Sequence, residues 1–284
     1  MSDSANHPTA RLADGFNKQG QSVQIVTLVF TSLSLYNGME LVAIIWSSFE
    51  HYRSVYFWAL FLSNTLGVIP YSIGAVLDVY GIGPQWLMLT IQLMGFYFMV
   101  PGQSVVLYSR LHLVLQNGKL LRAFRFLITM GTLLFLVPIS ISYYGSVYLQ
   151  HPWDHAYGII ERLQLIYFCV QEGLLSGAFI VETVRLIRLN PIQDRRRKGV
   201  LYELVVVNLV IIFLDVVLLL LEFLGFYFLQ VILKGMVYSL KLKLEFAVLG
   251  RLTSTICAPR PSLSWSTIQR STHKAGDIIH DPAY

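Results

Sequence analysis

Residues 200–228 read VLYELVVVNLVIIFLDVVLLLLEFLGFYF, and this stretch decides the class of fold. Its only charged side chains are those of Glu203, Asp215 and Glu222. About 20 apolar residues in a helix that rises about 1.5 Å per residue are enough to cross the hydrocarbon core of a bilayer. The stretch therefore predicts a transmembrane helix that carries acidic side chains within its span.

Six further apolar runs have the same character, and each is at least about 20 residues long. They cover residues 22–49, 54–80, 85–109, 124–149, 157–187 and 229–252. The boundary before the last run rests on Gly225 and its aromatic neighbours, so the turn between the last two helices can shift by several residues. The sequence predicts an all-α polytopic membrane protein, a bundle of seven transmembrane helices over residues 22–252.

The composition of the whole chain supports this class. Of its 284 residues, 55% are hydrophobic and 13% charged, whereas soluble domains have about 25% charged residues. The mean hydropathy of +0.59 excludes a soluble globule, because lipid must solvate most of the surface. Residues 1–21 and 253–284 are polar and predict disordered tails, and the first of them shows no cleavable signal peptide.

The distribution of Lys and Arg predicts the orientation in the membrane. One side holds fifteen of them, and the other side holds Arg11, Lys18 and Arg162. The fifteen are Arg53, Arg110, Lys119, Arg122, Arg125, Arg185, Arg188, Arg195, Arg196, Arg197, Lys198, Arg251, Arg260, Arg270 and Lys274. Because basic residues gather on the cytosolic side, we expect a lumenal or outside N-terminus and a cytosolic C-terminus. The net charge of +5 thus reports orientation and not a nucleic-acid partner, and the endoplasmic reticulum is the expected compartment.

Polar side chains inside the predicted spans are the candidate functional residues, because such residues are costly in lipid. They include Asn37, Glu40, Gln103, Glu172, Asp215, Lys241 and Glu245. Helical spacing places Asn37 with Glu40, and Lys241 with Glu245, each on one face. A carboxyl group buried without a cation resists ionisation and can act as an acid, the property that acid catalysis in an apolar cavity requires. Packing hydrogen bonds between helices are the alternative role.

Other polar residues and the prolines have simpler interpretations. Glu222 and Lys234 lie in the outer half of adjacent helices and are expected to neutralise each other. Lys241 lies in the last span, where a lysine could form a Schiff base with retinal, but the third span has no acid to serve as its counter-ion. Pro70, Pro101 and Pro138 break backbone hydrogen bonds within three spans and weakly favour a widened central cavity.

Several motifs carry a resemblance to a known family. They are YNGMEL at 36–41, PGQSVVLYSRLHL at 101–113, Gln171-Glu172 and YSLKLKLEFAVLG at 238–250. Over about residues 22–252 the chain resembles a fungal family of seven-span membrane proteins that includes the membrane-bound terpene cyclase of the ascofuranone type. The resemblance implies ring closure on an oxidised farnesyl chain of a prenylated phenol, without metal, nucleotide or other cofactor.

The roles of the residues follow from that chemistry. We predict Glu172 or Asp215 as the proton donor, with Glu40 and Asn37 orienting the substrate or accepting the final proton. Gln103, Lys241 and Glu245 are predicted to bind substrate, and aromatic rings can steady a carbocation. The expected partners are a lipophilic prenylated small molecule and the lipid bilayer, not nucleic acid, and the oligomeric state stays open.

Two other classes of function remain as alternatives. A seven-helix receptor or lipophilic-ligand-binding protein has the same topology, but Ser109-Arg110-Leu111 lacks an acid before the arginine and no NPxxY occurs in the last span. A membrane scaffold is the third. HExxH, GxSxG, Walker and Rossmann patterns are absent, and Cys169 and Cys257 form no CxxC metal pair.

Overall fold

The computed structural model describes residues 20–48, 55–115, 117–148, 153–189, 195–225 and 227–256. These residues are helical except for short turns, and they contain no strand, so the all-α prediction is confirmed. Most of the two predicted tails, residues 1–19 and 257–284, lies outside the described residues.

Seven helical units follow one another along the chain. They are α2 (Gly20–Ser48); α3 (Val55–Leu62), η2 (Ser63–Val68) and α4 (Ile69–Tyr80) as one continuous unit; α5 (Gln85–Val114); α6 (Gly118–Tyr148); α7 (Trp153–Leu189); α8 (Arg195–Phe223); and α9 (Tyr227–Ile256). Six of these units are long and apolar enough to cross a membrane. The unit not among them is α9, whose length is similar but which carries Lys234, Lys241, Lys243 and Glu245.

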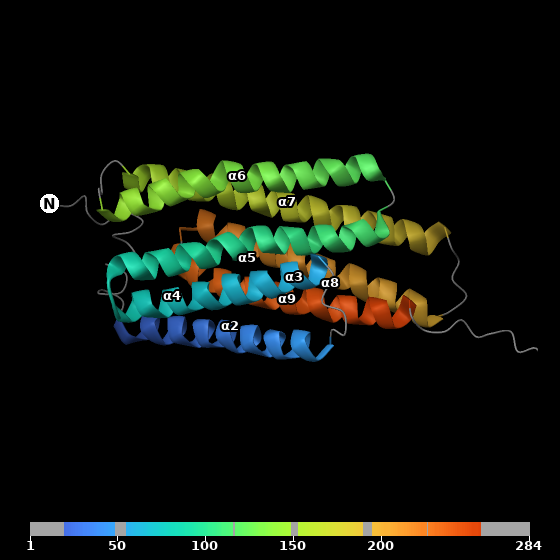
Figure 1. The fold of residues 1–284 in the computed structure, drawn as a ribbon, viewed down its shortest axis with the longest axis horizontal. Helices are drawn as coiled ribbons and strands as arrows, with labels where there is room; N and C mark the ends of the chain where they lie inside the picture. The colour runs from blue at the N-terminus through green and yellow to red at the C-terminus, as the bar shows by residue number, and fades with distance from the viewer. Residues whose placement is uncertain are drawn as a thin grey trace, which may run out of the picture.

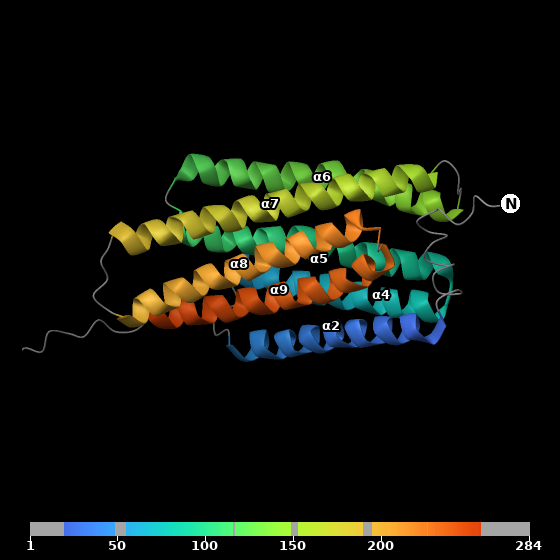
Figure 2. The same cartoon turned by 180° about the vertical axis from the view of Figure 1, so that it is seen from behind.

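The helices lie roughly along one axis, with α5 and α9 in the interior of the bundle (Figure 1). Helix α5 contacts α3, η2, α4, α6, α7 and α9, while α9 contacts α2, α4, α5 and α8. Helix α6 lies at one edge beside α7, and α2 lies at the opposite edge beside α4 and α9 (Figure 2). Polar side chains on α5, α7, α8 and α9 can therefore meet away from lipid.

The two ends of the bundle differ in their connections. Helices α4 and α5, α6 and α7, and α8 and α9 follow each other at one end, called here the Gly81 end, and the opposite end is called the Arg188 end (Figure 1). Gly81 and Gly225 turn the chain at the Gly81 end with φ of 62° and 77°, a conformation that glycine adopts without strain. The predicted turn near Gly225 is thus confirmed, with α8 ending at Phe223 and α9 beginning at Tyr227.

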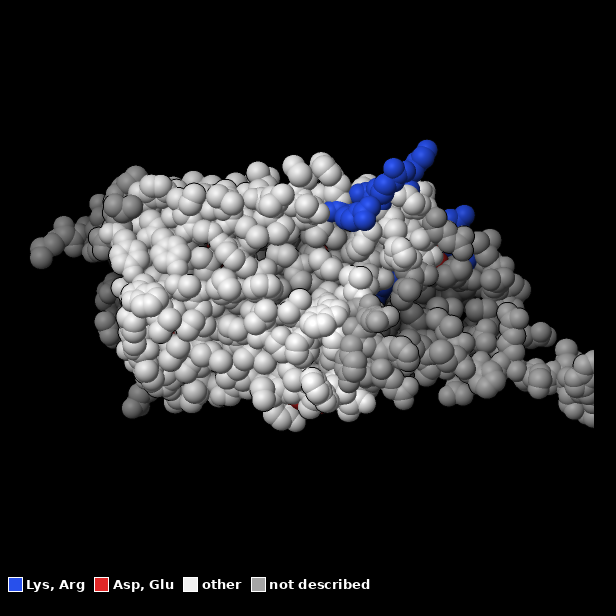
Figure 3. Space-filling view, in the orientation of Figure 1, with Lys and Arg blue, Asp and Glu red and all other residues white. Residues whose placement is uncertain are grey.

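The outer surface has the character expected of a lipid-facing bundle. Large apolar side chains such as Leu133, Leu134 and Val137 on α6 are about 60% exposed, because no other helix covers them. The face in Figure 3 is almost free of charge except for a basic patch over the Arg188 end. Lys119 and Arg122, at the start of α6, are exposed in this region. The prediction of a membrane protein agrees with this surface.

The three prolines within helices have different local effects. Helices α5 and α6 continue through Pro101 and Pro138, whereas the π-helical turn η2 ends just before Pro70. Proline lacks the N–H that an α-helix needs, and a wider turn before it accommodates the lost hydrogen bond. Close by, a Cβ on Gly67 would lie 2.7 Å from the backbone nitrogen of Met99, so α5 packs tightly against this unit.

Candidate functional site

One face of α9 is lined with polar side chains and points into the bundle. Gln230, Lys234, Tyr238, Lys241 and Glu245 recur at intervals of three or four residues, and all five are buried. Such spacing places them on one stripe of a helix. This stripe organises the polar interior, because partners on α5, α7 and α8 meet it at successive depths.

The middle of the stripe holds a cluster of charges, which we call the Lys241 cluster: Lys241, Glu172, Asp215 and Tyr238. Lys241 Nζ lies 2.9 Å from Glu172 Oε2 and also contacts Asp215 Oδ1. The Tyr238 hydroxyl donates to Glu172 Oε1 at 3.3 Å. The side chains of Lys241 and Glu172 have no exposed surface, so the cluster is enclosed by α7, α8 and α9.

A second buried ion pair lies nearer the Arg188 end. Arg110 Nε of α5 lies 2.5 Å from Glu245 Oε2, and its Nη2 donates to Glu245 Oε1 at 2.8 Å. The same nitrogen donates to Asn208 Oδ1 of α8 at 3.1 Å. The distribution of basic residues predicts Arg110 at the cytosolic flank of its helix, but the side chain turns inward and is 1% exposed.

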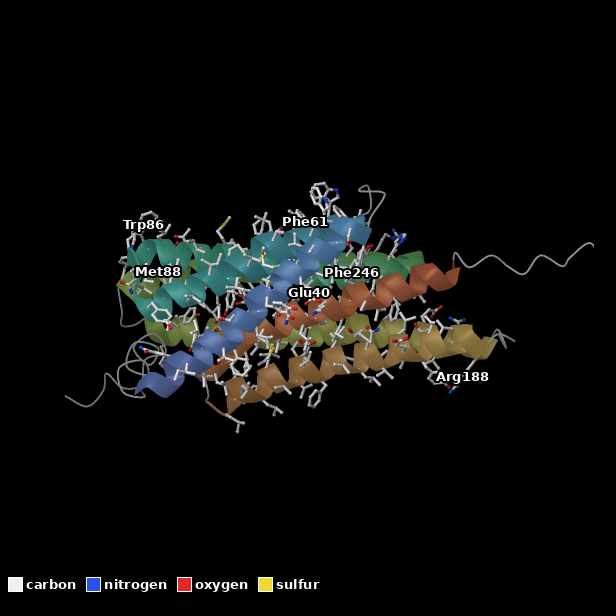
Figure 4. The ribbon with its side chains drawn as sticks, turned by 90° about the horizontal axis from the view of Figure 1, so that it is seen from below. Glu40, Phe61, Trp86, Met88, Arg188 and Phe246 are labelled. Carbon is white, nitrogen blue, oxygen red and sulfur yellow. The ribbon has the colours of Figure 1, made fainter. Side chains whose placement is uncertain are left out.

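A third polar contact joins α2 to the outer side of α9. Lys243 Nζ lies 2.6 Å from Glu40 Oε2 and 3.4 Å from Asn37 Oδ1, so the prediction that Asn37 and Glu40 share one polar spot is confirmed. Both partners of the Lys243–Glu40 pair are about one-third exposed. Figure 4 shows Glu40 midway along the bundle, between Trp86 at the Gly81 end and Arg188 at the other.

The predicted groupings of charges have different outcomes. Lys241 and Glu245 share one face of α9, as the spacing predicts, but each forms an ion pair with a partner on another helix. Glu222 accepts from Arg162 Nε at 3.2 Å, and Lys234 lies 3.5 Å from Glu161 Oε1, so these two do not neutralise each other directly. Spacing along one helix identifies residues on a shared face but not the neighbours that other helices supply.

The premise behind the predicted proton donors is also wrong. The sequence predicts Glu172 and Asp215 as carboxyl groups without a nearby cation, yet both contact the Lys241 amino group. Glu40, expected to join them, lies apart and pairs with Lys243. The catalytic role of these three acids stays a prediction, but it no longer has the support of an isolated buried carboxyl.

Gln103 occupies a different polar position in α5. Its side chain is fully buried, and neither amide atom has a hydrogen-bond partner among the described residues. The adjacent Ser104 accepts a hydrogen bond from Gln171 Nε2 at 2.8 Å, which ties α5 to α7. The contacts of Gln103 therefore do not test its predicted substrate-binding role, which stays a prediction.

A cavity of about 750 Å³, its open mouth included, lies near the Gly81 end. The volume that water-sized molecules can occupy within it is about 70 Å³, below the range of about 300–1,000 Å³ typical of small-molecule sites, so a larger ligand would also fill the mouth or displace the walls. Helices α2, α4, α5, α6, α7 and α9 contribute Thr27, Tyr71, Ala75, Asp78, Val79, Gln92, Leu93, Phe96, Ile139, Tyr143, Tyr157, Glu161, Gln164, Val231, Ile232 and Lys234. We call it the end cavity. None of the seven predicted site residues lines it.

The end cavity combines apolar walls with a few polar groups. Tyr143 donates to Gln92 Oε1 at 2.8 Å, and Lys234 Nζ lies 5.4 Å from the centre of the Phe96 ring. Glu161 Oε2 and Gln164 Nε2 have no hydrogen-bond partner within the described part of the chain, although both side chains are more than nine-tenths buried. Unpaired buried polar atoms on a cavity wall are available to a ligand or to water.

A smaller cavity, in which water-sized molecules can occupy about 20 Å³, lies next to the end cavity on the side of the Lys241 cluster. The two cavities share Phe96, Glu161, Gln164 and Lys234 as lining residues. The smaller one is also lined by Tyr238, whose hydroxyl bonds to Glu172. Tyr238 therefore stands between the cavities and the enclosed charges.

The polar residues of the end cavity were largely missed from the sequence. Asp78 lies near a helix end and is exposed, and Glu161 near the start of α7 was not singled out. A usable signal existed in α7, where Glu161, Gln164 and Gln171 recur on one helix face. A polar stripe inside an apolar span predicts a face turned away from lipid.

The geometry defines a class of protein: a helical bundle with a lipid-facing surface, a charged interior and an amphipathic cavity at one end. Residues 15–259 match the family described as a domain of unknown function, DUF7703. Because this match covers most of the chain, the protein belongs to the DUF7703 family. The comparisons with curated proteins and with solved structures gave no match.

Proposed function

We propose that all seven helical units cross the membrane, with the Gly81 end lumenal or outside and the Arg188 end cytosolic. The connection at 81–84 has no Lys or Arg, whereas Lys119, Arg122, Arg125 and Arg185 are exposed toward the other end. Basic residues favour the cytosolic side. The polar stripe of α9 is covered by neighbouring helices, so α9 can span the membrane despite its charges. The endoplasmic reticulum is the proposed compartment.

We propose that the protein is a membrane-bound terpene cyclase and that the end cavity holds its substrate, an epoxidised prenylated phenol. The observation that carries this proposal is the composition of the cavity, which brings an aromatic wall and the carboxyl groups of Asp78 and Glu161 together in one partly open cavity. The resemblance to the ascofuranone-type cyclase family favours the same reaction class.

The two acids of the end cavity have different surroundings, which suits them to different roles. Glu161 lies 3.5 Å from the Lys234 amino group and forms an ion pair with it. Asp78 has no ion-pair partner among the described residues, which makes it the better proton donor of the two. In this proposal Asp78 takes the role that the sequence assigned to Glu172 or Asp215.

The reaction balances without a cofactor. The Asp78 carboxyl group gives its proton to the epoxide oxygen as a C–O bond breaks, and the carbon left behind becomes a carbocation. The faces of Tyr71, Phe96 and Tyr143 lower the energy of that cation. A double bond or hydroxyl of the substrate then forms the ring, and the proton released returns to a cavity carboxylate. The product is an isomer of the substrate.

Expression in a host that lacks the pathway, followed by feeding of an epoxidised prenylphenol, tests the proposal. Mass spectrometry and NMR should find a cyclised product of unchanged mass. Asp78→Asn should lower conversion by at least about 100-fold, the usual contribution of general acid catalysis. Glu222→Gln is the matched control, because Glu222 is a buried acid that does not line the end cavity.

The same experiment separates the competing assignments. Loss of conversion in Glu172→Gln or Asp215→Asn, with Asp78→Asn still active, would return the catalytic role to the Lys241 cluster. If the protein binds the epoxidised prenylphenol without converting it, and Glu161→Gln weakens that binding, the protein would instead be a lipophilic-ligand-binding protein. If folded protein showed no binding and no conversion, this result would contradict the proposal.

A further inference from the structure

The Lys241 cluster differs from five other ion pairs of the described residues in its balance of charge. Each of the five joins one cation to one acid: Arg110 with Glu245, Lys234 with Glu161, Arg162 with Glu222, Arg185 with Glu182, and Lys243 with Glu40. Lys241 instead contacts two carboxyl groups, those of Glu172 and Asp215. If all three were ionised, the cluster would hold one uncompensated negative charge in the interior.

Among the residues that the structure describes, no other charge near the cluster cancels this excess. The titratable groups that face the cluster are Cys169 of α7, Tyr238 and Glu245 of α9, and Arg110 of α5, which Glu245 already neutralises. The cluster is enclosed, and an unpaired charge in such a site is strongly unfavourable. One bound proton removes the excess charge completely.

The arrangement of oxygen atoms also leaves a place for that proton. Asp215 Oδ2 is buried and has no hydrogen-bond partner within the described residues. The carboxyl groups of Glu172 and Asp215 both contact the Lys241 amino group, so the two acids share one enclosed site. Two carboxyl groups that share a site commonly share one proton.

A route connects this position with the end cavity. The Tyr238 hydroxyl bonds to Glu172 and its side chain lines the smaller cavity, which shares Glu161 and Lys234 with the end cavity. A hydroxyl both donates and accepts hydrogen bonds, so it can pass a proton between a carboxyl group and water in the cavity.

We infer that Glu172, Lys241 and Asp215 form a proton-binding site in the middle of the bundle, which exchanges its proton with the end cavity through Tyr238. The site holds one proton between the two acids while Lys241 stays charged. This inference stands independently of the proposed cyclase reaction, since it concerns the charge of the enclosed cluster and not the substrate.

Variants that remove one carboxylate provide the first test. Glu172→Gln imitates the protonated acid, so its thermal midpoint in lipid nanodiscs should stay within about 2 °C of the unaltered protein. Glu245→Gln is the matched control, because it removes an equally buried Glu from a balanced pair and should lower the midpoint by more than about 5 °C. Equal losses in the two variants would overturn the inference.

Infrared spectroscopy tests the bound proton directly in protein that keeps its native cluster. In an Asp78→Asn background, which removes the proposed acid of the end cavity, the C=O stretching band of a protonated carboxyl group should persist at neutral pH. Adding Glu172→Gln or Asp215→Asn should shift or remove the band. Absence of the band in the background protein would overturn the inference, whatever the outcome of the cyclase assay.

The variant Tyr238→Phe tests the route of proton exchange. After transfer to D₂O, the carboxyl band should shift at least tenfold more slowly in Tyr238→Phe, which lacks only the hydroxyl group. Tyr167→Phe is the control on α7, where the hydroxyl bonds to the Leu127 carbonyl and lies outside the cluster. Unchanged exchange in Tyr238→Phe would overturn the route through Tyr238.

Discussion

The Lys241 cluster and the end cavity place similar charged groups in opposite settings. Each brings a lysine of α9 beside an acid of α7, Lys241 with Glu172 and Lys234 with Glu161. The first pair is enclosed and linked at 2.9 Å, whereas the second is separated by 3.5 Å and lines an open cavity. Tyr238 and Lys234 lie four positions apart on α9, so one face of this helix contributes to both the cluster and the end cavity.

This difference shows why polar residues deep in a span need not form the binding site. Enclosed charges stabilise one arrangement of helices, because each must find its partner or remain unpaired in a medium of low dielectric constant. Charges that border a cavity keep access to water and to a ligand. The deepest acids of this chain belong to the first kind, and Asp78 and Glu161 belong to the second.

The largest effect is expected from Lys241→Met. It leaves two buried carboxyl groups without their cation, and breaking a buried ion pair costs about 3–5 kcal/mol. We expect the variant to lose most of its folded yield or to melt far below the unaltered protein in detergent. Normal stability would show that the cluster does not hold α7, α8 and α9 together.

A smaller effect is expected from Lys234→Met in the end cavity. Both side chains are more than nine-tenths buried, but only one carboxyl group loses its cation and that group borders the cavity, so the loss of stability should be smaller than that of Lys241→Met. Substrate binding should weaken at least tenfold, as measured by titration in nanodiscs. A stability loss as large as that of Lys241→Met would mean that the two settings are equivalent.

Tyr143→Phe measures how much one hydroxyl group of the cavity wall contributes to stability and to ligand binding. It removes a hydroxyl that donates to Gln92 Oε1 at 2.8 Å and leaves the ring in place. The free energy of unfolding should fall by about 0.5–1.5 kcal/mol, the net value of one hydrogen bond. Tyr97→Phe, which removes a hydrogen bond to the Leu136 carbonyl outside the end cavity, is the comparison. Only Tyr143→Phe should also alter ligand binding.

The smallest effect is expected from Arg185→Gln at the Arg188 end. Arg185 is 66% exposed and lies 3.8 Å from Glu182 one helical turn away. Exposed pairs of this kind contribute about 0.2–0.5 kcal/mol, so the melting temperature should hardly change. A large drop would indicate an unrecognised structural role for this end of α7.

Much of the helical architecture could be predicted from apolar runs. The start of α5 at Gln85, the end of α4 at Tyr80 and the turn near Gly225 agree with the predicted boundaries. Helices α6 and α7 begin several residues earlier than predicted, at Gly118 and Trp153. The added turns are rich in polar residues that an apolar run excludes, although the helical hydrogen bonds continue through them.

The candidate site could be predicted only in part. Glu172, Asp215 and Lys241 were recognised as costly residues within spans, and the structure brings them together. Their partnership was missed, because it joins α7, α8 and α9 across 69 and 26 positions of sequence. Asp78 was missed for a different reason, since its place near a helix end resembles that of an ordinary interfacial residue.

The sequence by itself determined the class of this protein, because long apolar runs can satisfy their backbone hydrogen bonds in lipid only as helices. It also determined which residues are costly to bury. Only the tertiary structure decided which charges neutralise each other and which border a cavity. Those outcomes depend on how the helices rotate and pack together, and side-chain partners from distant segments set that packing.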